Sequence, residues 1–135
     1  MAGVRFWREI QSRYNLVGVK CGNCGTIDFP PRPLCLKCHR ESVGKMEPYQ
    51  LSGVGEIVSY TIVHDAPKHL AMQVPYVLAI IKMAEGPNLT GQVLDIDPKD
   101  VKIGMKVRAT LRRVSEESPS GVIYYGYKFV PLQPL

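Results

Sequence analysis

The stretch CGNCGTIDFPPRPLCLKC, residues Cys21 to Cys38, contains all four cysteines of the chain as two Cys-X-X-Cys pairs separated by ten residues. In a reducing compartment, paired motifs near this spacing bind metal more often than they form disulfides. Each pair can turn tightly and direct two sulfurs inward, and Gly22 and Gly25 give the first turn its backbone freedom. We therefore expect a closed, structural Zn²⁺ site with four ligands: Cys21, Cys24, Cys35 and Cys38.

In the second turn, His39 stands where the first turn has Gly25. This histidine allows a second interpretation of the cysteines besides zinc binding. The segment from Cys35 to His39 matches the pattern for covalent haem attachment. Haem would leave Cys21 and Cys24 unexplained, and no export signal opens the sequence. A redox dithiol is a third interpretation, but the pairs lie in a Pro-rich segment and not at the start of a helix after a strand. Zinc is favoured over both.

Before the cysteines, the segment AGVRFWREIQSRYNL places aromatic and aliphatic residues on one helical face. These residues are Phe6, Trp7, Ile10 and Tyr14. One interpretation is that this short amphipathic helix covers the protein's own core. The other is that Phe6, Trp7 and Ile10 bind a partner protein, as a terminal apolar helix face can.

After the cysteines, the pattern changes to alternating β runs. Five strands are predicted, at residues 54–64, 75–83, 89–96, 106–114 and 122–130. Short strands separated by turn-rich segments suggest a small closed barrel. Between the third and fourth strands, Asp97 as a cap, Pro98 at the first position and Gly104 as a stop predict one short helix. This order resembles an OB-fold.

The predicted fold class is therefore mostly β, with an N-terminal helix, a zinc ribbon and a five-stranded OB-fold barrel. We assign residues 1–15 to the helix, 16–48 to the ribbon and 49–135 to the OB-fold domain. A chain of 135 residues that is 45% hydrophobic can bury enough surface for one compact domain plus a small appendage. No apolar run approaches the roughly 20 residues that span a bilayer, so we expect a soluble cytoplasmic protein with no membrane partner.

The charge distribution bears on nucleic-acid binding, the main alternative function for a ribbon joined to an OB-like barrel. The formal net charge is +5, but four thiolates on one Zn²⁺ would lower it to about +3. The barrel region is nearly neutral, whereas single-strand-binding barrels combine a basic groove with stacking aromatics. Tyr125 and Tyr127 share one predicted strand face, but such tyrosines more often pack in the core or at its rim. Nucleic acid is the less favoured partner.

Catalytic constellations are not evident. Zinc would use all four thiols, His39 adjoins a cysteine turn, and His64 and His69 flank a loop without a nucleophile beside them. No Gly-X-Ser-X-Gly elbow or phosphate loop occurs in the sequence. The chain is therefore predicted not to be an enzyme.

The ordered set of segments resembles the archaeal and bacterial OB-fold proteins with an N-terminal rubredoxin-like zinc ribbon, long a domain of unknown function. The resemblance covers nearly the whole chain. It is carried by RFWREI, KCGNCGTIDFPPRPLCLKC, GVGEIVSYTIV, PYVLAIIKMAEG and the Gly-Met-Lys-Val turn.

The resemblance implies a non-catalytic accessory of acyl-CoA metabolism. Similar archaeal chains bridge an acetoacetyl-CoA thiolase to hydroxymethylglutaryl-CoA synthase at the start of the mevalonate pathway, and others accompany acyl-CoA hydratases. With this role, basic residues of the ribbon become candidates for the phosphates of coenzyme A or acyl-CoA: Arg32, Lys37 and Arg40. The alternative is that these three side chains form an ordinary solvated basic face.

Overall fold

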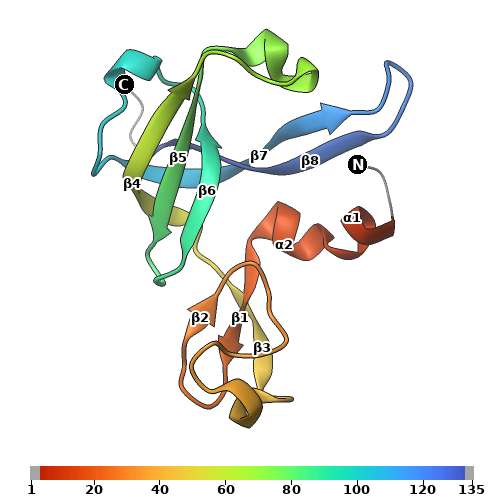
Figure 1. Ribbon diagram of the computed structural model, residues 1–135, viewed down its shortest axis with the longest axis vertical. Helices are drawn as coiled ribbons and strands as arrows, with labels where there is room; N and C mark the ends of the chain where they lie inside the picture. Colours follow the sequence, from red (N-terminus) through yellow and green to blue (C-terminus); the bar gives the residue numbers. More distant parts are fainter. Residues whose placement is uncertain (1–3, 133–135) are drawn as a thin grey trace.

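The computed structural model describes residues 4–132. Two short helices lead into a three-stranded ribbon, which a linker joins to a closed barrel (Figure 1). The helices are α1 (Val4–Arg8) and α2 (Ile10–Asn15), and the ribbon strands are β1 (Val17–Cys21), β2 (Ile27–Asp28) and β3 (Met46–Gln50). The barrel strands are β4 (Val54–Val63), β5 (Tyr76–Met83), β6 (Asn88–Val93), β7 (Lys106–Glu116) and β8 (Ile123–Pro131). The predicted fold class is confirmed.

The N-terminal helix predicted from the apolar spacing is present as two consecutive segments that meet at Glu9. The Glu9 carboxylate accepts hydrogen bonds from Arg5 at 3.2 Å and from Arg13 at 3.1 Å, one turn away on either side. Leu16 ends α2 with a left-handed backbone, at φ 52°. Residues 1–3 of the predicted helix lie outside the described part of the chain.

The ribbon strands pair antiparallel in the order β2-β1-β3. Strand β1 is central, and its Gly18 lies so close to β2 that an added Cβ would be 2.5 Å from the carbonyl oxygen of Asp28. Strand β3 continues past Pro48, which pairs with Val19, to Gln50. The ribbon thus ends close to the first barrel strand, Val54–Val63.

The barrel closes in the order β4-β5-β6-β8-β7. All strand pairs are antiparallel except β6 with β8, which run parallel and are in register only at Val93 and Phe129. At this closure an added Cβ on Gly91 would be 2.5 Å from the ring of Phe129, so glycine lets the two strands approach. The predicted short helix is the 3-10 turn η3 (Pro98–Asp100). The carboxylate of Asp97 caps it by accepting a hydrogen bond from the backbone N–H of Lys99.

Two further 3-10 helices were not predicted from sequence. They are η1 (His39–Ser42), beside the second cysteine turn, and η2 (Lys68–Gln73), the green helix above the barrel in Figure 1. Neither has a side-chain cap, so the sequence lacks the usual signal of a helix start. Within the described residues, no helix is long and apolar enough to cross a membrane.

One hydrophobic cluster joins the ribbon to the barrel. Leu16, Phe29 and Leu51, which lie in or beside the ribbon, belong to the same buried cluster as the barrel core. The ring of Phe29 meets the edge of Tyr127 with 5.7 Å between ring centroids, and Tyr127 meets Phe129 at 5.9 Å. These aromatic contacts fix the ribbon against β8.

Candidate metal centre and partner surface

Two cysteine turns of the same backbone geometry build the candidate metal centre. In the first, the N–H of Gly25 donates to the carbonyl of Cys21 at 2.9 Å, and in the second the N–H of His39 donates to the carbonyl of Cys35 at 3.0 Å. Gly25 has φ 76° and His39 has φ 50°, so both turns end in the left-handed region. His39 therefore adopts the conformation that glycine supplies in the first turn, although a side chain there is less favourable.

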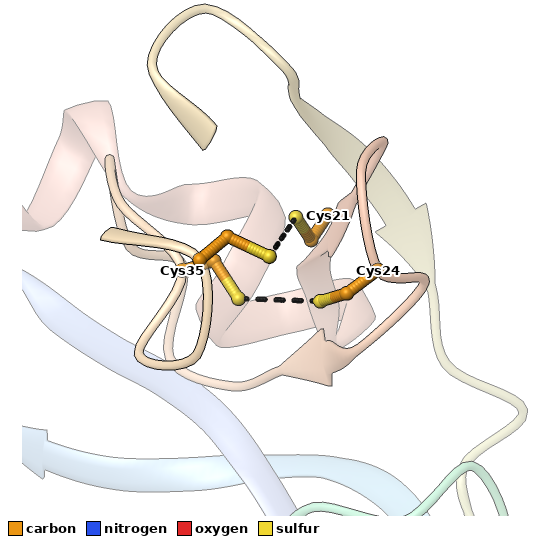
Figure 2. Close-up of side chains that lie close together, drawn as sticks. Cys21, Cys24 and Cys35 are labelled. Carbon is orange, nitrogen blue, oxygen red and sulfur yellow. Dashed lines mark hydrogen bonds between the residues drawn. The ribbon is translucent and has the colours of Figure 1, made fainter. Parts of the chain in front are cut away.

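The four sulfurs converge from the two turns, and Figure 2 shows those of Cys21, Cys24 and Cys35. All four sulfur atoms lie within 4.8 Å of one another. Cys24 and Cys35 are 3.5 Å apart, and Cys21 and Cys38 are 4.0 Å apart. A tetrahedral zinc ion with bonds of about 2.3 Å would separate its sulfurs by roughly 3.8 Å. The predicted ligands are thus placed together at the spacing that a metal requires.

Hydrogen bonds reach three of the four sulfurs from outside the cluster. The Asn23 amide donates to the sulfur of Cys38 at 3.2 Å, and the backbone N–H of Lys37 donates to Cys35 at 3.4 Å. The bond from Asn23 lowers the pKa of Cys38, but the neighbouring sulfurs and burial raise it overall to about 12. The Thr26 hydroxyl lies 3.1 Å from the sulfur of Cys24, and its hydrogen bond lowers the pKa of Cys24 to about 6. Donors to a sulfur stabilise its charged form, which is the form that binds metal. The convergence of all four cysteines favours a four-sulfur site over haem at one pair.

Ser42 supports the second turn and was not identified from sequence. Its side chain is fully buried. The hydroxyl accepts from the backbone N–H of Cys35 at 2.9 Å and donates to the carbonyl of His39 at 2.6 Å. It therefore ties η1 to the turn that carries two of the sulfurs. A serine seven residues after Cys35 has no recognisable motif, so only the folded geometry reveals this contact.

The N-terminal helices lie beside the β7–β8 hairpin (Figure 1), and the three residues predicted to bind a partner have different surroundings there. The ring of Phe6 packs edge-on against Tyr124 with 4.6 Å between centroids, so Phe6 covers the protein's own barrel. Ile10 is partly buried, but Trp7 is 71% exposed. Their role toward a partner stays a prediction.

A groove of about 360 Å³ lies between these helices and the hairpin. Its lining is mainly apolar and consists of Phe6, Trp7, Ile10, Tyr14, Glu117, Val122, Ile123 and Tyr124. Three apolar side chains of this lining are exposed: Trp7, Val122 and Ile123. Contiguous exposed apolar surface is typical of protein interaction sites.

The three residues predicted to contact coenzyme A lie in the ribbon. Arg32, Lys37 and Arg40 are all exposed, and none of them forms an ion pair with a carboxylate of the described residues. Lys37 lies between two of the metal ligands and Arg40 lies in η1, whereas Arg32 belongs to the proline-rich segment between the cysteine pairs. Nothing places the three side chains at one site.

The tyrosines considered for base stacking do not form a platform. Tyr127 packs between Phe29 and Phe129, and burial raises its pKa above the ordinary value. Tyr125 is partly exposed and meets the edge of Tyr14 with 6.5 Å between centroids. Tyr127 thus packs against the core and Tyr125 contacts α2, as the packing interpretation predicted.

Comparison with known proteins gives the family. A family model for the "ChsH2, rubredoxin-like zinc ribbon domain" matches residues 8–44, and one for the "ChsH2, C-terminal OB-fold domain" matches residues 49–112. A "DUF35 domain-containing scaffold protein" of Methanocaldococcus jannaschii is 51% identical over 130 residues, which cover 96% of this chain and 91% of that protein. The chain belongs to the DUF35 family. The resemblance stated from the sequence is thereby confirmed.

Other DUF35 relatives are connected by name with enzymes. A solved structure described as "Ltp2-ChsH2(DUF35) aldolase" contains a chain that matches with a TM-score of 0.72 and 30% identity, covering 96% of this chain and 94% of that one. A "probable enoyl-CoA hydratase alpha subunit" of Thermomonospora curvata is 34% identical over 102 residues, which cover 76% of this chain but 31% of that protein. The DUF35 fold thus occurs both as a separate chain and as part of a longer subunit.

Proposed function

We propose that this DUF35 protein is a non-catalytic, zinc-containing scaffold that bridges an acetoacetyl-CoA thiolase to hydroxymethylglutaryl-CoA synthase. Its relatives named as scaffold proteins support the general role. The relative named as an enoyl-CoA hydratase subunit supports an acyl-CoA enzyme as partner. The thiolase and the synthase come from the family resemblance and are the specific part of the proposal.

The observation that carries the proposal is the exposed Trp7 at the rim of an apolar groove. Tryptophan anchors interfaces because it buries a large area with few rotatable bonds. Phe6 is already packed on Tyr124, so it can hold the helix in place while Trp7 remains available. A monomer gains little from an exposed tryptophan, whereas an enzyme that covers the groove removes it from water.

Zinc would give this scaffold its rigid ribbon. Four closely spaced sulfurs form a closed site with no position for water or substrate, so the metal would stabilise structure and not catalyse. The ribbon strands have only 5, 2 and 5 residues, which is too little for an independent core. A ribbon stiffened in this way can hold one partner at a fixed position relative to another bound at the barrel.

Reconstitution tests the bridging role. The purified thiolase and synthase would be mixed with and without this chain, and their masses followed by size-exclusion chromatography with light scattering. We expect a ternary complex that contains both enzymes only when the chain is present. Two enzymes that associate equally well without it would contradict the proposal, as would a chain that binds neither enzyme.

Contact with coenzyme A is a separate part of the proposal. Arg32, Lys37 and Arg40 would offer positive charge to its phosphates once a partner enzyme brings the cofactor to the ribbon. The assembled complex should then bind coenzyme A more tightly than the complex containing Arg32→Ala, Lys37→Ala and Arg40→Ala together. The control is dephospho-coenzyme A, which should respond less to the triple change. Equal affinities would assign the three side chains to the solvated surface.

A further inference from the structure

A second groove lies on the barrel where β6 and β8 diverge. These strands are in register only at Val93 and Phe129, and the segments before those residues are not paired with each other. The groove has a volume of about 310 Å³. Its lining comes from β5 to β8, from η2 and from the N-terminal helices, and includes Phe6, Leu70, Leu78, Thr90, Val114 and Lys128.

The walls of this groove are apolar for a reason visible in the strand pattern. Val77 and Ala79 of β5 point into the barrel core and are buried. Leu78 alternates with them and therefore lies on the outer face, across from Gln92 of β6. An outer face normally carries polar side chains toward water. Here Leu78 faces a groove that Leu70 of η2 also lines.

Lys128 is the unusual member of the lining, because the residue is only 6% exposed. Its ammonium donates to the side-chain oxygen of Gln73 at 3.4 Å, and Gln92 donates to the same oxygen at 3.1 Å. No carboxylate lines the groove, and no ion pair in the described part of the chain includes Lys128. Buried lysines are normally paired with a negative charge. The charge of Lys128 is thus left without a counter-ion.

The other charged residues near the groove do not neutralise the positive charge of Lys128. Burial lowers the pKa of Lys128, and the positive charges of Arg112 and Arg113 lower it further. Arg13, also in the lining, already has a carboxylate partner in Glu9 at 3.1 Å. An anion in the groove would therefore meet one ammonium without a carboxylate partner, beside apolar walls.

We propose that this groove binds a small monocarboxylate with a short, unbranched apolar chain. The carboxylate would accept a charge-assisted hydrogen bond from Lys128, and the chain would lie against Leu78 and Val114. The volume is at the lower end of the range for small-molecule sites, about 300 to 1,000 Å³, which suits a short chain. This groove shares only Phe6 with the groove beside Trp7, called the Trp7 groove below. The proposed site does not require the scaffold role.

Octanoate is the probe that tests this site on the isolated, full-length, metal-loaded protein. Its titration, below the concentration at which it forms micelles, would be followed by ¹H–¹⁵N NMR. We expect saturable shifts at the amides of Gln92 and of residues 125–128, and weaker binding of 1-octanol, which has the same chain without the charge. Shifts that do not saturate, or that map to the Trp7 groove, would overturn the proposal, as would equal binding of octanol.

Two variants separate the head-group contact from the apolar walls. Lys128→Met keeps the length of the side chain but removes its charge, and we expect octanoate to bind roughly tenfold more weakly or worse. Thr90→Trp leaves Lys128 in place and fills the groove from an exposed position of β6, so it should also abolish binding. Lys45→Met, an exposed lysine of the ribbon, is the matched control and should bind as the unchanged protein does.

If Lys128→Met binds octanoate as tightly as the unchanged protein does, the carboxylate does not contact Lys128, and this part of the proposal is wrong. A further outcome concerns a macromolecular occupant. If octanoate does not bind, but Lys128→Met loses an enzyme partner that Lys45→Met retains, the groove belongs to an acidic segment of that partner. The small-molecule site would then be wrong.

Discussion

The ribbon and the barrel are both small β structures, but their interiors differ. The barrel encloses a continuous apolar core that includes Ile57, Ile81 and Phe129, all with no exposed surface. The ribbon buries two of its cysteines as deeply as any of its apolar side chains. Where a chain is too short to build a core, sulfur ligands to a metal can replace one. The comparison predicts that the two regions respond to different perturbations.

Metal removal should have the largest effect, and mainly on the ribbon. Structural zinc contributes on the order of 10 kcal/mol to the folding of small metal-binding domains. A chelator, or Cys38→Ser, should therefore unfold the ribbon while most of the β circular dichroism of the barrel remains. Hydrogen exchange should show lost protection at β1 and retained protection at β5. Simultaneous loss in both strands would contradict the separate origins of their stability.

The same experiment measures how far the two regions are coupled. Phe29 contacts Tyr127 from the ribbon side, so an unfolded ribbon removes one wall of the shared cluster. We therefore expect the barrel without metal to melt at a lower temperature. Phe29→Ala in the metal-loaded protein should reproduce part of that decrease without metal loss.

Phe129→Ala should have the next largest effect, and mainly on the barrel. The ring is fully buried where β6 meets β8, and replacing such a side chain by alanine costs about 3–5 kcal/mol. Chemical denaturation would measure the loss. Bound metal, determined by elemental analysis under native conditions, should stay at one equivalent per chain. The control is Ile103→Ala at an exposed position, which should change the unfolding free energy little.

Ser42→Ala should have an intermediate effect confined to the ribbon. It leaves the buried N–H of Cys35 without its acceptor, which costs about 1–3 kcal/mol. The second turn would loosen, and the protein should give up its metal to a chelator faster. Ser120→Ala changes an exposed serine of the β7–β8 turn and should release metal at the original rate. Equal rates in both variants would show that the hydroxyl does not support the site.

The smallest effect is expected from exchanging the residues that end the two turns. His39→Gly should stabilise the ribbon by less than about 1 kcal/mol, because glycine adopts a positive φ more easily but loses more entropy on folding. Gly25→His should destabilise it by a similar amount, since no atom lies within 4 Å of the added Cβ and only the backbone opposes the change. Chelator competition would measure both. A destabilising His39→Gly, or a Gly25→His that does not destabilise, would show that the two turns are not equivalent.

The barrel could be predicted well because its strands alternate between core and surface. The run predicted at residues 75–83 became β5 (Tyr76–Met83), with Val77, Ala79 and Ile81 inside. Alternation also places Lys128 on the outer face, where a solvated lysine would be expected. It is buried because the non-periodic segment η2 lies near it and supplies Gln73. Sequence patterns indicate which face a residue occupies but not what a distant loop places over it.

The candidate metal centre was predictable because its ligands are adjacent in sequence. Cys-X-X-Cys spacing reports a local turn, and two such turns need only meet. The partner surface was harder, since Phe6 and Trp7 have the same pattern but different surroundings: Phe6 contacts Tyr124, whereas Trp7 is exposed. That distinction depends on the β7–β8 hairpin, more than 100 residues further along the chain. Helical periodicity alone could not separate the two residues.

The most direct test of the scaffold role is the affinity of Trp7→Ala for the thiolase, measured together with its melting temperature. We predict that binding weakens by about 2 kcal/mol or more, as for a central interface anchor, while the melting temperature stays nearly unchanged because Trp7 is already exposed. Ile103→Ala, at an equally exposed apolar position, should keep both properties. A large fall in melting temperature with thiolase binding preserved would contradict the account and place the partner surface elsewhere.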